Sequence, residues 1–278
     1  MATKRVLAIH DICSFGRCSL TAAIPVISAM GIQVCPFPTA LFSNNLTYGT
    51  FTFSDFTPHM NEFMDMWQSL GYSYDAVYSG FLADAAQIAV VQDAIRRFAK
   101  PDTLVIVDPA MADDGKLYPV FKPDIITEMG KLIGNATVIT PNYTEACLLL
   151  NHPYADRIPS TKDMTELCRR LIDQGPEKVV ITSVPAPNEE IKIVSYDKQT
   201  ASFDEYAVQR LPFNTCGTGD LFSSVLTGAL LNGSNLHAAV RKAADFLSYA
   251  ITYTYHSGSD CREGVQVEPC LKKLMEIQ

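Results

Sequence analysis

A glycine-rich stretch, NTCGTGD at residues 214–220, combines residue types that could handle a phosphate group. Gly217 and Gly219 allow backbone dihedrals that point successive N–H groups at one anion. An apolar helical run follows from Leu221, so the positive end of a helix would point at the same place. Asp220, in the first turn, could then accept a proton from an attacking hydroxyl group. From these residues alone, a glycine turn that merely caps a helix is an equal alternative.

Polar side chains follow four apolar runs of strand length, at the point where each run ends. They are Asp11, Asp108, Thr140 with Asn142 and Glu145, and Thr182 with Ser183. In open α/β sheets the ligand site lies beyond the carboxyl ends of the strands, so we expect these side chains along one edge of a sheet. A single carboxylate after a strand is usually a helix cap or a turn former. Four such strand ends together predict a site, and the stretch at 214–220 would lie on the same edge.

The elements that must position these residues alternate between strands and helices along the whole chain. Predicted strands cover residues 5–9, 32–37, 75–79, 103–107, 136–140 and 178–182, and predicted helices cover 19–30, 57–70, 88–98, 122–132, 145–150, 160–171, 219–231, 236–255 and a terminal segment from Glu268. Two alternating strands between 190 and 206, with a turn near Asp197 and Lys198, predict a hairpin at the sheet edge. Strands buried on both faces and separated by helices imply a three-layer α/β/α fold with a mostly parallel, doubly wound sheet. Since no linker or change of composition divides the chain, we expect one domain over residues 1–278.

Two of the predicted helices have recognisable beginnings. Thr57 with Pro58 behind it is typical of an N-cap followed by proline at the first helical position. Ser160 and Asp163 have the spacing of a capping box. The helix after Thr57 would carry one apolar face, formed by Met60, Phe63, Trp67 and Leu70.

Composition narrows the class of protein. The chain has 278 residues, 47% hydrophobic and 19% charged, which is ordinary for a globular protein. Its formal net charge of −8 argues against a nucleic acid or a membrane as partner, because nucleic acids and anionic membranes attract basic surfaces. No amino-terminal apolar segment is long enough for a signal peptide or a membrane span. Because the chain as a whole is acidic, a phosphate would be bound by local basic groups, backbone amides or metal ions.

The cysteines and histidines indicate no metal site of their own. The eight cysteines form no C-x-x-C pair, which argues against a zinc site and a redox dithiol. We expect reduced, mostly buried thiols in a cytoplasmic protein. The five histidines are scattered without ligand spacing. The motifs of P-loop enzymes, dinucleotide dehydrogenases and protein kinases do not occur in the sequence.

Several motifs resemble those of known small-molecule kinases. The stretch at 214–220 resembles the carboxyl-terminal signature of the ribokinase superfamily, and NYTE at 142–145 resembles its N-x-x-E motif. Together with DPAMAD at 108–113, ITS at 181–183 and GTGDLF at 217–222, they are similar to the pyridoxal kinase branch. The resemblance runs from the first predicted strand to the helix after Asp220. It implies a ribokinase-like fold and the ATP-dependent phosphorylation of the 5′-hydroxymethyl group of pyridoxal, pyridoxine or pyridoxamine.

The resemblance also implies roles for individual residues. Asp220 would be the base, and Gly217, Thr218 and Gly219 would form the anion hole. The ATP phosphates and their cations would be surrounded by Asp108, Asp113, Thr140, Asn142, Glu145, Thr182, Ser183 and Thr218. Of these, Asp108, Asp113, Thr140 and Glu145 would bind Mg²⁺, with Glu145 acting largely through metal-bound water, and K⁺ would lie near Asp108 and Thr140. Residues 111–121 would form a mobile flap over the phosphates. The resemblance further suggests a homodimer.

On the substrate side the chain departs from the pyridoxal kinase pattern. The residues expected near the vitamer are Asp11, Ser43, Asn44, Thr47, Phe81, Cys216 and Asp220. Pyridoxal kinases commonly carry Ser-His where this chain has Asp11-Ile12, S-N-H-T-G where it has SNNLTYG at 43–49, and Tyr where it has Phe81. Asp11 could bind a ring nitrogen or hydroxyl of the vitamer, or cap a turn. Cys216 could pack as a small apolar residue, or its thiolate could add to the aldehyde of pyridoxal.

Two other functions stay open: a kinase of another small alcohol, chiefly hydroxymethylpyrimidine and less so a sugar, and a non-catalytic carrier or sensor of the vitamer. Hydroxymethylpyrimidine kinases usually begin with a Gly-Ser-Asp stretch and end their signature in Cys, whereas this chain has HDICSFG at 10–16 and Asp220. Sugar kinases of the superfamily usually have a paired-glycine motif, which this sequence does not contain. A non-catalytic carrier or sensor of the vitamer would not need Asp220, Glu145, Asp108 and Asp113. The sequence leaves open which vitamer is preferred.

Overall fold

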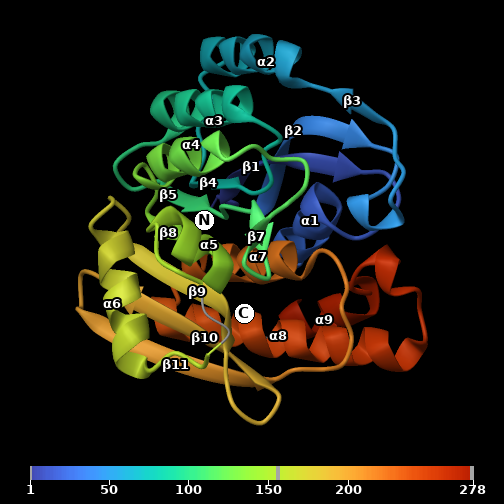
Figure 1. Ribbon diagram of the computed structural model, residues 1–278. Helices are drawn as coiled ribbons and strands as arrows, with labels where there is room; N and C mark the ends of the chain where they lie inside the picture. The colour runs from blue at the N-terminus through green and yellow to red at the C-terminus, as the bar shows by residue number, and fades with distance from the viewer. Residues whose placement is uncertain (1, 155–156, 276–278) are drawn as a thin grey trace.

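The computed structural model describes residues 2–154 and 157–275, which fold into three layers (Figure 1). Within these residues, nine strands form one sheet in the order β11-β10-β9-β8-β5-β4-β1-β2-β3. The strands are β1 (Arg5–Cys13), β2 (Gln33–Phe42), β3 (Phe53–Asp55), β4 (Ala76–Ser79), β5 (Leu104–Val107), β8 (Val138–Ile139), β9 (Lys178–Pro185), β10 (Glu190–Asp197) and β11 (Ser202–Gln209). The run from β2 through β1, β4, β5 and β8 to β9 is parallel, and β3, β10 and β11 are antiparallel. The predicted mostly parallel sheet with an edge hairpin is confirmed.

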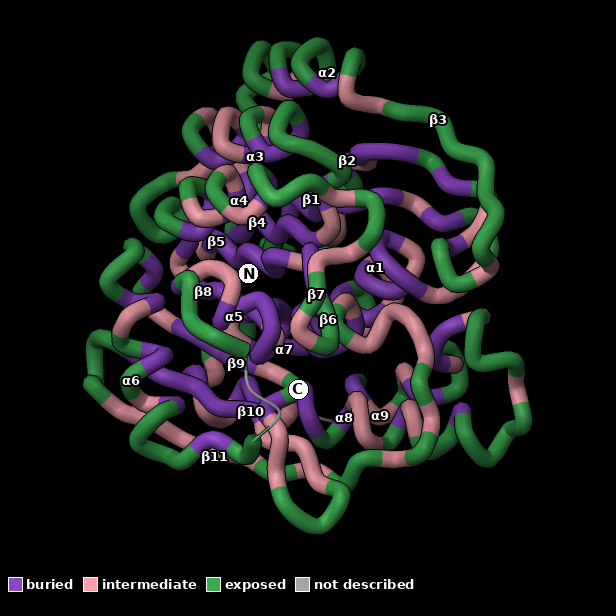
Figure 2. Tube along the Cα trace, in the orientation of Figure 1, coloured by how far each residue is buried: buried purple, intermediate pink, exposed green. Residues whose placement is uncertain are grey.

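Helices cover both faces of this sheet. They are α1 (Ser19–Ala29), α2 (Thr57–Ser69), α3 (Ala85–Phe98), α4 (Asp124–Ile133), α5 (Tyr143–Leu149), α6 (Thr161–Ile172), α7 (Thr218–Leu231), α8 (Leu236–Ser257) and α9 (Leu271–Met275). Successive residues of a strand point to opposite faces, so Leu7 and Ile9 pack under α2 to α6 while Val6 and Ala8 pack under α1, α7, α8 and α9. The central strands are buried, whereas α2 is mostly exposed (Figure 2). None of the described helices has the length and apolarity that crossing a membrane requires.

Strand β2 is longer than predicted, and β3 was not predicted. The apolar pattern of β2 is interrupted by Pro36 and Pro38, which have no N–H to give to a neighbouring strand. In the structure both prolines pair with β1 on one side, while β3 covers only the later residues from Ala40 to Phe42 on the other. The prolines therefore lie where the strand forms the edge of the sheet, and there a missing donor is tolerated.

The start of α2 also differs from the prediction. Phe56 is the N-cap, Thr57 is already the first helical residue, and Asp55 accepts hydrogen bonds from the N–H (2.9 Å) and hydroxyl (2.6 Å) of Thr57. The predicted apolar face is only partly correct, because the buried residues of α2 are Met60 and Met64. Phe63 and Leu70, by contrast, are 42% and 56% exposed. A helix that packs over the outer part of a sheet buries a narrow stripe, and neighbours outside that stripe stay in solvent.

Candidate functional site

The amino terminus of α7 forms a cradle at the carboxyl ends of the parallel strands. Gly217 precedes the helix with φ +78°, and a Cβ there would lie 2.1 Å from the carbonyl oxygen of Arg17. Only glycine fits this approach. Thr218, Gly219 and Asp220 form the first helical turn, whose N–H groups have no acceptor within a helix. A Cβ on the exposed Gly219 would have only the Asp108 carboxylate near it, at 3.8 Å. The cradle is therefore open to an anion.

Asp220 lies in this first turn with its side chain 18% exposed. Its Oδ2 accepts a hydrogen bond from the Ser19 N–H (2.7 Å), and its Oδ1 lies 3.8 Å from Nδ1 of His10. Burial raises the pKa of Asp220 to about 6; the Ser19 N–H opposes this and the charge of Asp11 adds to it. A carboxylate with a pKa close to neutral pH is suited to general base catalysis beside an anion cradle.

Asp11 belongs to the same network. It is 5% exposed, and its Oδ1 accepts a hydrogen bond from the Ser19 hydroxyl (2.7 Å). Its Oδ2 lies 3.5 Å from the Cys13 thiol that donates to it, and burial raises its pKa. Ser19 therefore joins Asp11 through its hydroxyl and Asp220 through its amide, with a left-handed backbone (φ +52°) at the start of α1. Strained backbone of this kind persists where the surrounding structure fixes it.

Asp108 follows β5 and lies beneath the cradle. It is 7% exposed and accepts a hydrogen bond from the Ser223 hydroxyl (3.0 Å), which is also 3.0 Å from the Thr140 hydroxyl. Burial, and then the charge of Asp220, raises the pKa of Asp108 to about 7. A buried carboxylate with hydroxyl oxygens beside it, close to the second carboxylate of Asp220, is a donor set that hard cations prefer.

These donors do not form a complete metal site. Among residues 2–154 and 157–275, no three His, Cys, Asp or Glu side chains are grouped closely enough to hold a metal ion. A cation bound beside Asp108 and Thr140 would therefore need further oxygen ligands from phosphates or water. Such a shell is usual for Mg²⁺ at phosphate sites.

Glu145 and Asn142 anchor a small hairpin. This hairpin consists of β6 (Ala112–Asp113) and β7 (Lys116–Leu117), which were not predicted. Glu145, 2% exposed, accepts from the N–H groups of Met111 (2.9 Å), Ala112 (3.3 Å) and Asn142 (2.8 Å). Asn142 caps α5 and donates its side-chain amide to the Ala112 carbonyl (2.7 Å). Burial and the charge of Asp108 raise the pKa of Glu145 despite these donors.

The other residues predicted at the phosphate site lie around this hairpin. Asp113 is exposed on β6 and accepts from the N–H of Asp114 (3.0 Å). Thr182 forms an isolated parallel β-bridge with Asn142 and donates its N–H to the Pro141 carbonyl (3.0 Å). Ser183 is exposed and has a left-handed backbone, φ +56°. These polar groups remain accessible at the edge, whereas Glu145 and Asn142 already use their side chains within the protein.

The remaining residues predicted around the vitamer come from separate segments of the chain, between β2 and β3, after β4 and before α7. Ser43 and Asn44 hold the loop between β2 and β3, because Ser43 accepts from the Thr52 N–H (2.9 Å) and Asn44 donates to the Thr50 carbonyl (2.8 Å). The exposed Thr47 donates its hydroxyl to Asn45. Phe81 is half-buried, with its ring 5.4 Å from that of Phe121.

Cys216 is half-buried directly before the cradle. Its thiol lies 3.5 Å from the carbonyl oxygen of Arg262. The neighbouring Cys18 thiol, together with burial, raises the pKa of Cys216. The structure therefore favours the packing interpretation, since a thiol with a raised pKa stays protonated at neutral pH. All eight cysteines are free, and five of them are buried.

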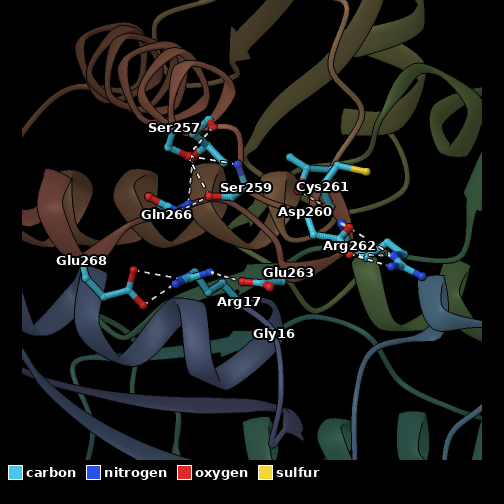
Figure 3. A network of polar contacts seen from close by, with 12 residues as sticks. Gly16, Arg17, Ser257, Ser259, Asp260, Cys261, Arg262, Glu263, Gln266 and Glu268 are labelled. Carbon is cyan, nitrogen blue, oxygen red and sulfur yellow. Dashed lines mark hydrogen bonds and ion pairs between the residues drawn. The ribbon is translucent and has the colours of Figure 1, made fainter.

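A network from the carboxyl-terminal segment holds the turn that precedes α1. Arg17 lies between Glu263 and Glu268, with its Nε 2.8 Å from Glu268 and a guanidinium nitrogen 3.7 Å from Glu263 (Figure 3). The Arg17 N–H donates to the Glu263 carbonyl (2.9 Å). Thr215 donates its hydroxyl to the carbonyl of Cys261 (2.7 Å). The network thereby fixes the cradle loop and the turn that carries Ser19 against one another.

Sequence reasoning missed three residues of this site: His10, Ser19 and Ser223. Ser223 could have been found, because it lies three residues after Asp220 on α7 and so shares its helical face. His10 and Ser19 gave no such signal. Their roles depend on the packing of β1 and α1 against α7.

Comparison with known proteins assigns the chain to a family. The profile of the phosphomethylpyrimidine kinase family matches residues 15–264. The chain belongs to this family. A Bacteroides thetaiotaomicron structure described as a phosphomethylpyrimidine kinase and determined with pyridoxal is 40% identical, with a TM-score of 0.93, over 98% of this chain and 96% of its own.

Two pyridoxal kinases are also similar along almost the whole chain. The structure of pyridoxal kinase from Lactobacillus plantarum is 28% identical, with a TM-score of 0.91, over 99% of this chain and 98% of its own. A pyridoxal kinase of Burkholderia lata is 26% identical over 91% of this chain and 89% of its own. These similarities confirm the predicted ribokinase-like fold and the resemblance to pyridoxal kinases.

Proposed function

We propose that the protein is an ATP-dependent kinase that phosphorylates the 5′-hydroxymethyl group of a vitamin B6 vitamer. The observation that carries this proposal is the position of Asp220, a carboxylate with a pKa of about 6 in the first turn of α7, directly beside the cradle of Gly217, Thr218 and Gly219. The similarity to pyridoxal kinases, and to a relative determined with pyridoxal, supports the vitamer as the acceptor.

Different groups at the cradle would accept the proton of the substrate hydroxyl and stabilise the negative charge of the phosphoryl group. Asp220 takes the proton from the attacking hydroxyl group, so that the oxygen becomes nucleophilic as its bond to the γ-phosphorus of ATP forms; the bond from that phosphorus to the bridging oxygen breaks, and ADP leaves. The N–H groups of Thr218 and Gly219, with the dipole of α7, stabilise the negative charge on the phosphoryl oxygens during transfer. Because these groups are fixed by the helix, they need no reorganisation at the moment of reaction.

Mg²⁺ and K⁺ fit the acidic side of the cradle. Asp108 and Thr140 would hold a cation there, together with the exposed Asp113, while Glu145 would reach it only through water because its oxygens already accept three backbone N–H groups. When bound, the cations neutralise the charge of the phosphates. The raised pKa of Asp108 supports this assignment, since a nearby cation would favour its ionised form.

A hydroxymethylpyrimidine is the second candidate acceptor, because the matching family profile is that of phosphomethylpyrimidine kinases. Asp220, where hydroxymethylpyrimidine kinases usually have Cys, favours the vitamer. A non-catalytic vitamer-binding protein is disfavoured by the combination of a base, a cradle and two buried carboxylates.

The experiment is a competition assay. Purified protein is incubated with ATP, Mg²⁺ and K⁺ and with pyridoxal, pyridoxine, pyridoxamine and hydroxymethylpyrimidine together, and the products are identified by mass spectrometry. We expect a phosphorylated B6 vitamer. Phosphorylation of the pyrimidine alone would contradict the substrate and leave the phosphate site intact. Ligand binding without any product would contradict the kinase.

We further propose that the chain acts as one domain over residues 1–278, as a homodimer, in the cytoplasm. One core cluster joins Val6 near the amino end to Leu274 near the carboxyl end, which supports a single domain. Exposed Phe51 and Phe53, which pack on one another at the β3 edge, would suit a subunit contact. The free thiols agree with a reducing compartment. Light scattering after size exclusion tests the dimer, for which a monomeric mass would be the contrary result.

A further inference from the structure

His10 is a buried histidine beside the proposed base, with no hydrogen-bond partner among the described residues. It lies on β1, it is 0% exposed, and neither ring nitrogen has a partner within the described residues. The nearest charged atom is Oδ1 of Asp220, 3.8 Å from Nδ1. Buried polar atoms in folded proteins are almost always paired, so an orphaned ring at this place requires an explanation.

Tyr78 and Gly80 pack closely around the His10 ring. The Tyr78 ring meets it edge-on, with centroids 4.4 Å apart and planes at 70°. Gly80 lies on another side, where a Cβ would come within 2.2 Å of the ring Cε1 and 2.3 Å of Nδ1. The imidazole therefore fits here only because residue 80 is a glycine and has no side chain. In this position Nδ1 lies 3.8 Å from Oδ1 of Asp220.

We propose that His10 is a positioning residue for Asp220: its neutral ring donates the Nδ1 proton to Oδ1 of the carboxylate when the site is assembled around substrate. This inference rests on the proposed kinase function. The Ser19 amide already holds Oδ2 at 2.7 Å, so a donor at Oδ1 would fix the carboxylate from both sides. The present distance of 3.8 Å is long for a hydrogen bond, and catalytic hydrogen bonds of this kind commonly shorten in the substrate complex.

The surroundings of Asp220 call for such a donor. Six other titratable groups interact electrostatically with Asp220. They are two carboxyls, two thiols and two phenols: Asp11, Asp108, Cys18, Cys216, Tyr78 and Tyr118. None of them contributes a positive charge. Burial lowers the pKa of His10 to about 3, so the ring stays neutral at working pH and does not compete with Asp220 for the substrate proton.

Two variants of similar size separate donation from packing. His10→Asn keeps an amide donor near the place of Nδ1, whereas His10→Leu fills a similar volume without a donor. In the leucine variant we expect the acid limb of kcat, which reports the substrate complex, to move upward by about one to two pH units, with an about 2- to 10-fold loss at pH 7 that is recovered at high pH. The asparagine variant should keep the limb close to that of the wild type. An unchanged limb in the leucine variant, or equal shifts in both variants, would overturn the proposal.

A second measurement needs neither turnover nor a variant of His10. In the ¹⁵N NMR spectrum of the wild-type imidazoles with pyridoxine and ADP bound, His10 should be neutral with the proton on Nδ1, and its signals should change as Asp220 titrates. Asp220→Asn should abolish that change. A proton on Nε2, or signals that ignore the Asp220 substitution, would refute the proposal. Because this readout does not depend on phosphorylation, its failure is distinguishable from failure of the kinase assignment.

Discussion

Replacing Asp108 with asparagine should stabilise the protein while impairing its activity. In the folded state the pKa of Asp108 is raised from 3.8 to about 7, chiefly by burial. Below pH 4 the carboxyl group is protonated in both states, and the folded state has no penalty. Above pH 7 the folded state must carry the ionised form. The difference of about three pH units corresponds to a penalty of about 4 kcal/mol. Asparagine carries no charge and can still accept the Ser223 hydrogen bond.

The assay is urea unfolding of both proteins at pH 4.5 and pH 8, with chelator and without K⁺. We expect Asp108→Asn to raise the free energy of unfolding by about 2–4 kcal/mol at pH 8 and by at most about 1 kcal/mol at pH 4.5. The exposed Asp102, replaced in the same way, serves as the control and should show no such gain. Equal destabilisation by Asp108→Asn at both pH values would refute the reasoning, because it would mean that the ionised carboxylate is well solvated or paired.

Three further predictions concern the cradle, the β6–β7 hairpin and the proposed base. Gly217→Ala should destabilise the protein by more than about 2 kcal/mol, because its Cβ would collide with the Arg17 carbonyl and because φ at this position is positive. Gly219→Ala should preserve stability and impair turnover. Equal loss of stability in both variants would contradict this prediction. Glu145→Gln should increase proteolytic cleavage in the hairpin it anchors, with limited proteolysis as the readout, and unchanged protection would count against that anchor. With two different vitamers, kcat/KM should fall about tenfold from pH 7 to pH 5, because protonation of Asp220 near pH 6 removes the base, and a flat profile would exclude it.

The layers of the fold could be predicted because burial on both faces gives parallel strands continuous apolar runs. The runs at 5–9 and 178–182 became β1 and β9, and the alternation after residue 190 became the β10–β11 hairpin. Short strands such as β3 and β6 have no apolar run of their own, because they form only where an adjacent strand is available to pair with them. The apolar face of α2 was misjudged at Phe63 for a related reason: helical spacing tells which residues share a face, but not how much of that face the sheet covers.

The site could be predicted where one local motif fixes the geometry. Asp220 and its glycines are adjacent in the sequence, so their arrangement follows from the start of α7. The Ser19 amide and His10 approach Asp220 across the fold, from β1 and the first turn of α1. A backbone amide has no residue type to reveal it, and a lone histidine after a buried strand is more often part of the core. Only the tertiary structure shows both groups at one carboxylate.

The most direct test of the account is to compare Asp220→Asn with the wild type for turnover of the preferred vitamer and for ATP binding, by mass spectrometry and calorimetry respectively. Because a positioned base contributes about 10²–10⁴-fold, we predict a loss of kcat of that order with ATP affinity retained. Turnover close to that of the wild type in this variant would contradict the claim that the first turn of α7 holds the catalytic base.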